Sequence, residues 1–342
     1  MEIILPIILF IIGLAVIIKG GDLFVDSAIW VAKVTGIPNI IIGATIVSLA
    51  TTLPELFVST IATVSGSPDI AIGNAIGSII CNTGLILAIS MIFMPGEVEK
   101  ESFLPKAFTM VVSTILLLLF ATSGSINWIE GILLILVLIY YIRQNLMEAK
   151  KSMILSNEAA ATIAEEEASI VEKPTSRVVV KNIAMFIGGA ALIVIGARLL
   201  VNNAQIIAKF FKVPESIVSL TIVALGTSLP ELVTALTSIA KKEGGVAVGN
   251  IIGANILNID MIVAVCGIIS KGGLVITSRN LIIGGFRFIN FHQTLLMDIP
   301  VALLMMLLII MPVILKGKYS KKNGIALLSV YILYIAFLFI SL

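Results

Sequence analysis

The sequence predicts an all-α polytopic membrane protein, with about ten transmembrane helices arranged as two inverted five-helix repeats. Composition is the first observation behind this prediction: 59% of the 342 residues are hydrophobic and only 12% are charged. Soluble domains carry about twice that share of charged residues. The net charge of +2 gives no reason to expect a nucleic-acid partner. Both cysteines, Cys81 and Cys266, fall in apolar segments, so no disulfide framework is expected.

Long apolar stretches are the second observation, and charged residues or clusters of Gly, Pro and Ser divide them into pieces of helix length. A helix needs about 20 apolar residues to cross a bilayer. Several pieces are longer, which indicates tilted helices or ends that project into water. The ten candidate helices span residues 3–33, 39–64, 69–94, 104–122, 126–147, 178–209, 214–240, 245–270, 294–315 and 323–341.

An internal repeat with an offset of 176 residues is the third observation. Residues 45–58 share nine of 14 positions with residues 221–234. Residues 73–82 share six of 10 positions with residues 249–258, at the same offset and without a gap. Five helices in each half is an odd number, so the second copy must cross the membrane in the opposite direction to the first. Paired inverted repeats of this kind are typical of secondary transporters.

The repeat divides the chain into a first five-helix repeat over residues 1–147, a polar linker over residues 148–177 and a second repeat over residues 178–342. The linker contains Glu165, Glu166 and Glu167 together with scattered lysines. It has no calcium-loop spacing. We therefore interpret it as a solvated connector rather than as an ion-sensing segment.

Basic residues orient the predicted helices in the cell membrane, because short cytoplasmic loops are enriched in Lys and Arg. The amino-terminal residues lack a basic region and a cleavage site, so they are expected to begin the first spanning helix rather than a removed signal. With the N-terminus outside, the 148–177 linker is cytoplasmic; the loop around residues 271–293 argues against this orientation. Fifteen of the 22 basic residues then face the cytoplasm, namely Lys33, Lys100, Lys106, Arg143, Lys150, Lys151, Lys173, Arg177, Lys181, Lys241, Lys242, Lys316, Lys318, Lys321 and Lys322.

The repeated motif places a carboxylate inside the bilayer twice, directly after a proline: Pro54 precedes Glu55, and Pro230 precedes Glu231. Proline has no amide hydrogen and breaks the helical hydrogen-bond ladder. Carbonyls released in a membrane must be buried in protein or line a polar cavity. A buried carboxylate costs about 2.5–3.5 kcal/mol on insertion scales, so a purely structural role in both repeats is hard to explain.

Oxygen atoms surround these two glutamates in the sequence. The carbonyls of Ser48, Thr51, Ala224 and Thr227 are expected to be loosened by the break, and the hydroxyls of Thr51, Thr52, Thr227 and Ser228 can cap them or turn toward an ion. The third and eighth helices add Ser78, Asn82 and Asn258, although membrane asparagines also serve simply to join helices. Two carboxylates with hydroxyl, carbonyl and amide oxygens are the ligand set that Ca²⁺ takes. His292 is the only histidine, so a zinc or copper site is less expected.

These motifs resemble those of the calcium:cation antiporter superfamily, and within it the prokaryotic sodium/calcium exchangers. The resemblance lies in residues 43–55 with 73–78, and in residues 221–231 with 249–258. The proton/calcium branch is less similar, because its motif has Gly-Asn where this chain has Leu-Pro before the glutamate. Two positions depart from many exchangers: Asn258 stands where Asp is common, and Ala254 where Ser is common. Both departures leave the number and identity of the counter-ions open.

The resemblance implies ten helices, four ion sites and exchange of several Na⁺ for one Ca²⁺. It assigns Glu55 and Glu231 to bridge Ca²⁺, with carbonyls of Thr51 and Thr227 as further ligands. It assigns the flanking Na⁺ sites to Ser48, Thr52, Ser78, Ala224, Ser228 and Asn82.

The leading interpretation is therefore a Na⁺/Ca²⁺ antiporter that works by alternating access. The nearest alternative keeps the fold but uses H⁺ as the driving ion, or carries another cation. A passive cation channel is less compatible with paired broken helices at one occluded site. An intramembrane carboxylate enzyme would leave the Thr, Ser and carbonyl ligands without a role. The expected partners are Ca²⁺, Na⁺ and the lipid bilayer, with no cofactor, no nucleic acid and no sign of an obligatory protein partner.

Overall fold

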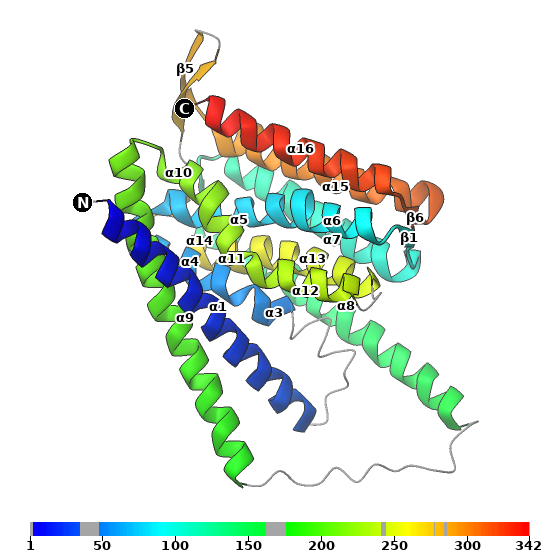
Figure 1. Cartoon of the computed structure of the whole chain (residues 1–342). Helices are drawn as coiled ribbons and strands as arrows, with labels where there is room; N and C mark the ends of the chain where they lie inside the picture. The colour runs from blue at the N-terminus through cyan, green and yellow to red at the C-terminus, as the bar shows by residue number, and fades with distance from the viewer. Residues whose placement is uncertain are drawn as a thin grey trace.

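The computed structural model describes residues 3–34, 48–161, 176–240, 244–276, 278–283 and 286–341, and most of them are helical (Figure 1). Eight helices in these ranges are long and apolar enough to cross a membrane, and one bent helix pair makes a ninth span. The first part of the second predicted helix, residues 39–47, lies outside the described residues. The protein is thus a multi-pass, all-α membrane protein.

The first half follows the predicted helices closely up to its last member. That helix, α8, continues to Ala161, so its end lies well inside the segment 148–177 that was expected to be a linker. The elements of this half are α1 (Ile4–Val34), α3 (Ser48–Thr51), α4 (Leu53–Val64), α5 (Pro68–Cys81), the π-helical turn η2 (Asn82–Leu87), α6 (Ala88–Phe93), α7 (Lys100–Ala121) and α8 (Trp128–Ala161).

The second half repeats the central elements of the first at an offset of 176 residues. Its elements are α9 (Ser176–Phe211), α10 (Glu215–Val218), η3 (Ser219–Val223), α11 (Ala224–Thr227), α12 (Leu229–Ala240), α13 (Gly244–Leu257), η4 (Asn258–Val263), α14 (Ala264–Ile269), η5 (Thr294–Asp298), α15 (Ile299–Lys316) and α16 (Lys321–Ile340). The bounds of α4 and α12 differ by 176, and so do those of η2 and η4.

Short strands between the helices show that the two halves are inverted. β1 (Gly96–Glu97) pairs with β6 (Lys318–Tyr319), and β2 (Ser125–Ile126) pairs with β3 (Leu274–Val275). In each pair, a strand that follows the third helix of one half meets the strand between the last two helices of the other half. The 22-residue helix α7 connects β1 to β2, which places the two strand pairs about 33 Å apart at opposite ends.

Two glycines repeat this crosswise arrangement inside the helix bundle. A Cβ atom added to Gly131 of α8 would lie 2.7 Å from the carbonyl oxygen of Ala264. A Cβ atom added to Gly324 of α16 would lie 2.6 Å from the carbonyl oxygen of Ala88, the repeat mate of Ala264. Only glycine allows the last helix of each half to approach the third helix of the other half so closely.

Helices α1 and α9 lie side by side and run antiparallel (Figure 1). Gly13 packs on the backbone of Gly196, and Gly20 packs on the backbone of Gly189. These glycines are two helical turns apart on each helix, so they form one smooth contact surface between the two halves.

The third helices form the centre of the molecule. In the spans Pro68–Phe93 and Ala247–Ile269, 78% and 89% of the most apolar window is buried, against 22% for α16. A hairpin of β4 (Arg279–Ile283) and β5 (Phe286–Phe291) projects from the bundle between α14 and α15 (Figure 1). The first half has no hairpin between α6 and α7, and the sequence patterns did not predict this one.

Candidate cation site

The second helix of each half is interrupted where the repeated motif predicts a break. In the first half the helix stops at Thr51, Thr52 forms a turn, and α4 begins at Leu53. In the second half α11 stops at Thr227, and the helix beyond Ser228 is bent by 43° relative to the helix before it. A proline inside the first turn of the new helix prevents the hydrogen-bond ladder from continuing.

The break leaves some of the expected carbonyls bonded. The Ser48 carbonyl accepts the N–H of Thr52 at 3.1 Å, and the Ala224 carbonyl accepts the N–H of Ser228 at 3.0 Å. The expectation that the break loosens these two carbonyls is therefore wrong, because each keeps its helical partner. Proline removes the N–H that would bond to the carbonyl four residues before it, and those carbonyls belong to Ala50 and Gly226.

Two glutamate side chains lie at the centre of the site. Glu55 and Glu231 are both fully buried, and their carboxylates are close enough to repel one another. Ser228 donates to Glu55 Oε1 at 3.1 Å, whereas Glu55 Oε2 and both Glu231 oxygens have no hydrogen-bond partner among the described residues. No described Lys or Arg forms an ion pair with either carboxylate. Buried, repelling carboxylates of this kind are stabilised when a cation lies between them.

Polar side chains of the third helices add further unpartnered oxygens. Asn82 and Asn258 begin the π-helical turns η2 and η4, a local geometry common at functional sites. Their amide nitrogens donate to Asn255 Oδ1 at 3.3 Å and to the Ala254 carbonyl at 2.9 Å, respectively. Both Oδ1 atoms and the hydroxyl oxygen of Ser78 are buried without a partner among the described residues. Each of these atoms can accept a cation, and hard cations prefer such oxygens.

The hydroxyls of Thr51 and Thr52 lie beside the Glu231 carboxylate but donate elsewhere. Both donate to the Ser48 carbonyl, at 3.2 Å and 2.8 Å. Glu231 therefore presents two bare oxygens to the site. The charge of the site comes from two carboxylates, because the described part of the chain holds no group of three or more His, Cys, Asp and Glu side chains. Together, the arrangement can bind a hard cation in a dehydrated, oxygen-lined position.

A known protein family matches nearly the whole chain. The family model described as sodium/calcium exchanger protein matches residues 5–146 and 181–340. The chain belongs to the sodium/calcium exchanger family. It is therefore a multi-pass membrane antiporter of Ca²⁺ and a second cation, from a family of transporters rather than of enzymes.

Individual relatives of the exchanger agree with this assignment. The chain is 31% identical over 256 residues to the uncharacterized membrane protein MJ0091 of Methanocaldococcus jannaschii. This match covers 75% of this chain and 79% of the relative. The chain is 26% identical over 301 residues to the sodium/calcium exchanger MaX1 of Methanosarcina acetivorans, covering 76% and 82%. A solved structure of the sodium-calcium exchanger NCX_Mj soaked with Na⁺ and Ca²⁺ is similar with a TM-score of 0.63 and 29% identity, covering 97% and 98%.

Four buried polar residues of the exchanger had no predicted role. Asn74, Asn250 and Asn255 hydrogen-bond next to the site, and Asp260 lies two residues after Asn258. Asp260 Oδ2 accepts a hydrogen bond from a serine of α7 at 2.6 Å, and its Oδ1 has no partner among the described residues. The signal was present in the sequence, since an acid within an apolar span is a functional candidate by default.

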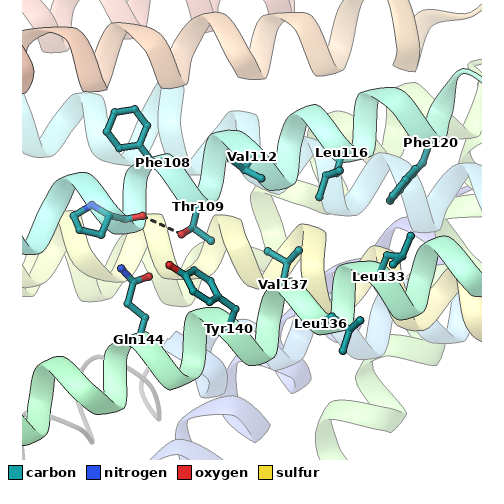
Figure 2. Close-up of a pocket in the computed structure, with 11 residues that line it drawn as sticks. Phe108, Thr109, Val112, Leu116, Phe120, Leu133, Leu136, Val137, Tyr140 and Gln144 are labelled. Atoms are coloured by element: carbon teal, nitrogen blue, oxygen red, sulfur yellow. Dashed lines mark hydrogen bonds between the residues drawn. The ribbon is translucent and has the colours of Figure 1, made fainter.

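A separate groove of about 640 Å³ lies between α7 and α8 of the exchanger (Figure 2). Phe108, Val112 and Leu136 are among the hydrocarbon side chains that line it, and the Thr109 hydroxyl there donates to the Pro105 carbonyl at 2.9 Å. No carboxylate lines this groove, and its polar side chains are Thr109, Tyr140 and Gln144. The buried oxygen cluster, which holds two carboxylates, is therefore the better candidate for a cation site.

Proposed function

We propose that the protein exchanges Na⁺ for Ca²⁺ at the buried oxygen cluster, with Ca²⁺ between Glu55 and Glu231. The observation that carries this proposal is the pair of fully buried carboxylates, which have three unpartnered oxygens and no basic partner among the described residues. One divalent ion neutralises two carboxylates, and the carbonyls of Thr51 and Thr227 at the helix breaks complete its ligand set. No cofactor takes part, because the ions are cargo.

Na⁺ occupies the positions that flank the Ca²⁺ position in this proposal. The flanking oxygens come from residues on both sides of the glutamate pair. They belong to Ser48, Thr52, Ser78, Ala224, Ser228, Asn82 and Asn258. When Na⁺ fills these positions it takes carboxylate oxygens that Ca²⁺ requires, so the two ions compete. Competition for shared ligands couples the movement of one ion to the opposite movement of the other.

Alternating access follows from the inverted halves. The site lies between them, and the antiparallel pair α1 and α9 packs through small residues that allow sliding along their contact. Movement of this pair relative to the central helices exposes the site to one side of the membrane at a time.

The deciding experiment is ⁴⁵Ca²⁺ uptake into proteoliposomes that contain the purified protein. Vesicles loaded with Na⁺ are expected to accumulate Ca²⁺ when diluted into Na⁺-free buffer, and vesicles without Na⁺ are not. Uptake that ignores Na⁺ and follows an imposed pH gradient would instead identify H⁺ as the counter-ion. Uptake without any ion gradient, and without saturation, would indicate a channel.

The orientation in the cell membrane forms part of the proposal, with the N-terminus outside and the end that carries β1 and β6 in the cytoplasm. Lys318 lies at that end and Lys271 at the end that carries β2 and β3, and both side chains are exposed. Cysteines introduced singly at these positions are expected to react with a membrane-impermeant maleimide from opposite sides of the membrane. The native Cys81 and Cys266 are buried and give little background. Labelling of both positions from one side would contradict the crossing of α15 between them, and labelling of position 318 from outside the cell would contradict the proposed orientation.

A further inference from the structure

Ser48 and Ala224 are one of the pairs of repeat mates at which the two halves of the site differ. Ser48 carries a hydroxyl that Ala224 lacks, and both residues supply a carbonyl to a flanking position. Each of these residues packs against a glycine of the opposite half: Ser48 lies against Gly253, and Ala224 lies against Gly77. A buried asparagine lies one turn before each glycine, namely Asn74 before Gly77 and Asn250 before Gly253. Ser48 therefore offers a hydroxyl to Asn250, whereas Ala224 offers none to Asn74.

Asn74 is the asparagine next to Ala224. It is fully buried, its Nδ2 donates to the Glu55 carbonyl at 3.3 Å and to Ser59 Oγ at 3.0 Å, and its Oδ1 accepts from the Thr227 hydroxyl at 3.1 Å. Asn74 thereby joins α4 and α5 of the first half to α11 of the second half.

Asn250, the repeat mate of Asn74, is bonded differently. Its Oδ1 accepts from the Ser48 hydroxyl at 2.8 Å, and its Nδ2 is buried without a partner among the described residues. Ala235 stands where Ser59 would be in the first half, so no hydroxyl is present to accept from that nitrogen. Asn250 Oδ1 accepts from Ser48 and not from Thr51, whose hydroxyl donates to the Ser48 carbonyl.

The consequence appears in the number of donors on each carbonyl. A carbonyl oxygen has two lone pairs. The Ser48 carbonyl receives three donors, namely the Thr52 N–H and the hydroxyls of Thr51 and Thr52. The Ala224 carbonyl receives the Ser228 N–H, and the Thr227 hydroxyl lies 3.2 Å away from it but has Asn74 Oδ1 as an alternative acceptor at 3.1 Å.

We propose that Asn74 is a positioning residue for the flanking Na⁺ position on the Ala224 side: by accepting the Thr227 proton, it leaves one lone pair of the Ala224 carbonyl free for the ion. Asn250 has no equivalent role, because it accepts from Ser48 and not from Thr51. The two flanking positions are therefore unequal, and the one on the Ala224 side binds Na⁺ more tightly. This inference rests on the proposed Na⁺/Ca²⁺ exchange.

The test compares Asn74→Ala with Asn250→Ala, which removes the same number of atoms at the mirror position. The measurement is competition of Na⁺ with ⁴⁵Ca²⁺ binding to the purified protein in detergent. Asn74→Ala is expected to raise the Na⁺ concentration for half-competition about fivefold, the equivalent of one net hydrogen bond. Asn250→Ala is expected to stay within about twofold of the wild type.

A double-mutant cycle separates positioning from general loosening of the fold. In a Thr227→Val background no Thr227 proton exists, so Asn74→Ala is expected to cause no further shift in Na⁺ competition. Ala224→Ser provides a second route, because the new hydroxyl would donate to Asn74 Oδ1 as Ser48 donates to Asn250 Oδ1, and would compete with Thr227 for that acceptor. Ser48 shows that a serine fits against a glycine at this place, so Ala224→Ser is expected to fold and to raise the half-competing Na⁺ concentration as well.

The outcomes distinguish the two proposals. Equal shifts in Asn74→Ala and Asn250→Ala, or a shift of Asn74→Ala that persists beside Thr227→Val, would overturn the positioning role and leave the exchange intact. Two results together would overturn the proposed exchange and this inference with it. They are the absence of Na⁺ competition with ⁴⁵Ca²⁺ binding to the wild-type protein, and the absence of Na⁺-driven Ca²⁺ uptake into vesicles.

Discussion

The third helices of the two halves change from α-helical to π-helical geometry at the same place but pack differently just beyond it. Residues 82–87 and 258–263 both form a π-helical turn that begins with asparagine. The third position of the first turn is Gly84, where an added Cβ would lie 2.8 Å from Met305 and Tyr331. The matching position of the second turn is Asp260, whose Oδ2 accepts from Ser113 at 2.6 Å.

This difference shows on which face the two halves match. Asn82 and Asn258 belong to the candidate cation site, and both have an Oδ1 without a partner among the described residues. Two residues later the turn faces away, toward α15 and α16 in one half and toward α7 in the other. A cation requires particular oxygens at particular distances. A helix contact requires only that space is filled and polar groups are paired, so the outer face could diverge into an apolar contact and a carboxylate contact.

The largest expected effect tests whether the ion-facing sides are equivalent. Glu55→Gln and Glu231→Gln are each expected to lower Na⁺-dependent Ca²⁺ uptake by at least about 100-fold. Each variant removes one carboxylate from the buried pairing with Ca²⁺, and removing one partner of a buried ion pair costs about 3–5 kcal/mol. Glu130→Gln is the matched control, since Glu130 caps α8 through the N–H of Asn127 and lies outside the site. Near-normal exchange in either site variant would contradict the assignment of that glutamate.

The glycine contacts on the crosswise helices should be equally sensitive in both halves. Gly131→Ala and Gly324→Ala each place a methyl group within 2.7 Å of a backbone oxygen that cannot move aside. Overpacking of this kind costs about 1–3 kcal/mol. Thermal unfolding in detergent should show a lower midpoint for both variants and an unchanged midpoint for Gly188→Ala, where nothing lies within 4 Å. A large effect in only one half would show that the two crosswise contacts are not equivalent.

The stability of the contact between η4 and α7 should depend on the Ser113 hydroxyl. Ser113→Ala leaves the Asp260 carboxylate without its donor, and we expect a loss of about 1–3 kcal/mol in stability. Ser90→Ala removes a buried hydroxyl that bonds only within its own helix, to the Ile86 carbonyl, and should cost much less. If both variants unfold at the same temperature, the contact between Asp260 and α7 contributes nothing to stability.

Asn258→Asp gives the smallest expected effect. It adds a third carboxylate beside Glu55 and Glu231, and the resemblance to exchangers with Asp at this position indicates that the fold accepts it. We expect Ca²⁺ to bind about fivefold more tightly and to be released more slowly, because the added charge is near the cation. Asn182→Asp, on the exposed face of α9, is the control. Identical Ca²⁺ titrations of Asn258→Asp and the wild type would mean that Asn258 serves only to join helices.

Much of the architecture was readable from the sequence because membrane helices obey simple rules. The apolar lengths predicted the spans, and the 176-residue repeat predicted which elements would match; α5 and α13 differ by less than two residues from the predicted starts. The glutamates and Asn82 were predicted as candidates. The structure buries Glu55 Oε2, both Glu231 carboxylate oxygens and Asn82 Oδ1 without a partner among the described residues. Their role as ligands remains a prediction.

Asp260 and the hairpin of β4 and β5 were not predicted, for different reasons. The repeat indicates ligands only where both halves carry a polar residue, and it places Gly84 at the position of Asp260. An insertion in one repeat has no mate for comparison, so the hairpin could not be inferred from symmetry.

The sequence by itself determined that the chain crosses the membrane many times and carries two buried carboxylates beside helix breaks. Burial of apolar residues and the missing amide hydrogen of proline act locally, so they can be read along the chain. Only the tertiary structure decided which acceptors surround each hydroxyl. Thr51 and Thr227 both lie 3.2 Å from the carbonyl three residues earlier, yet only Thr227 has Asn74 as a second acceptor. That difference goes with the bond between Ser48 and Asn250, which are 202 residues apart and meet only when the two halves pack together.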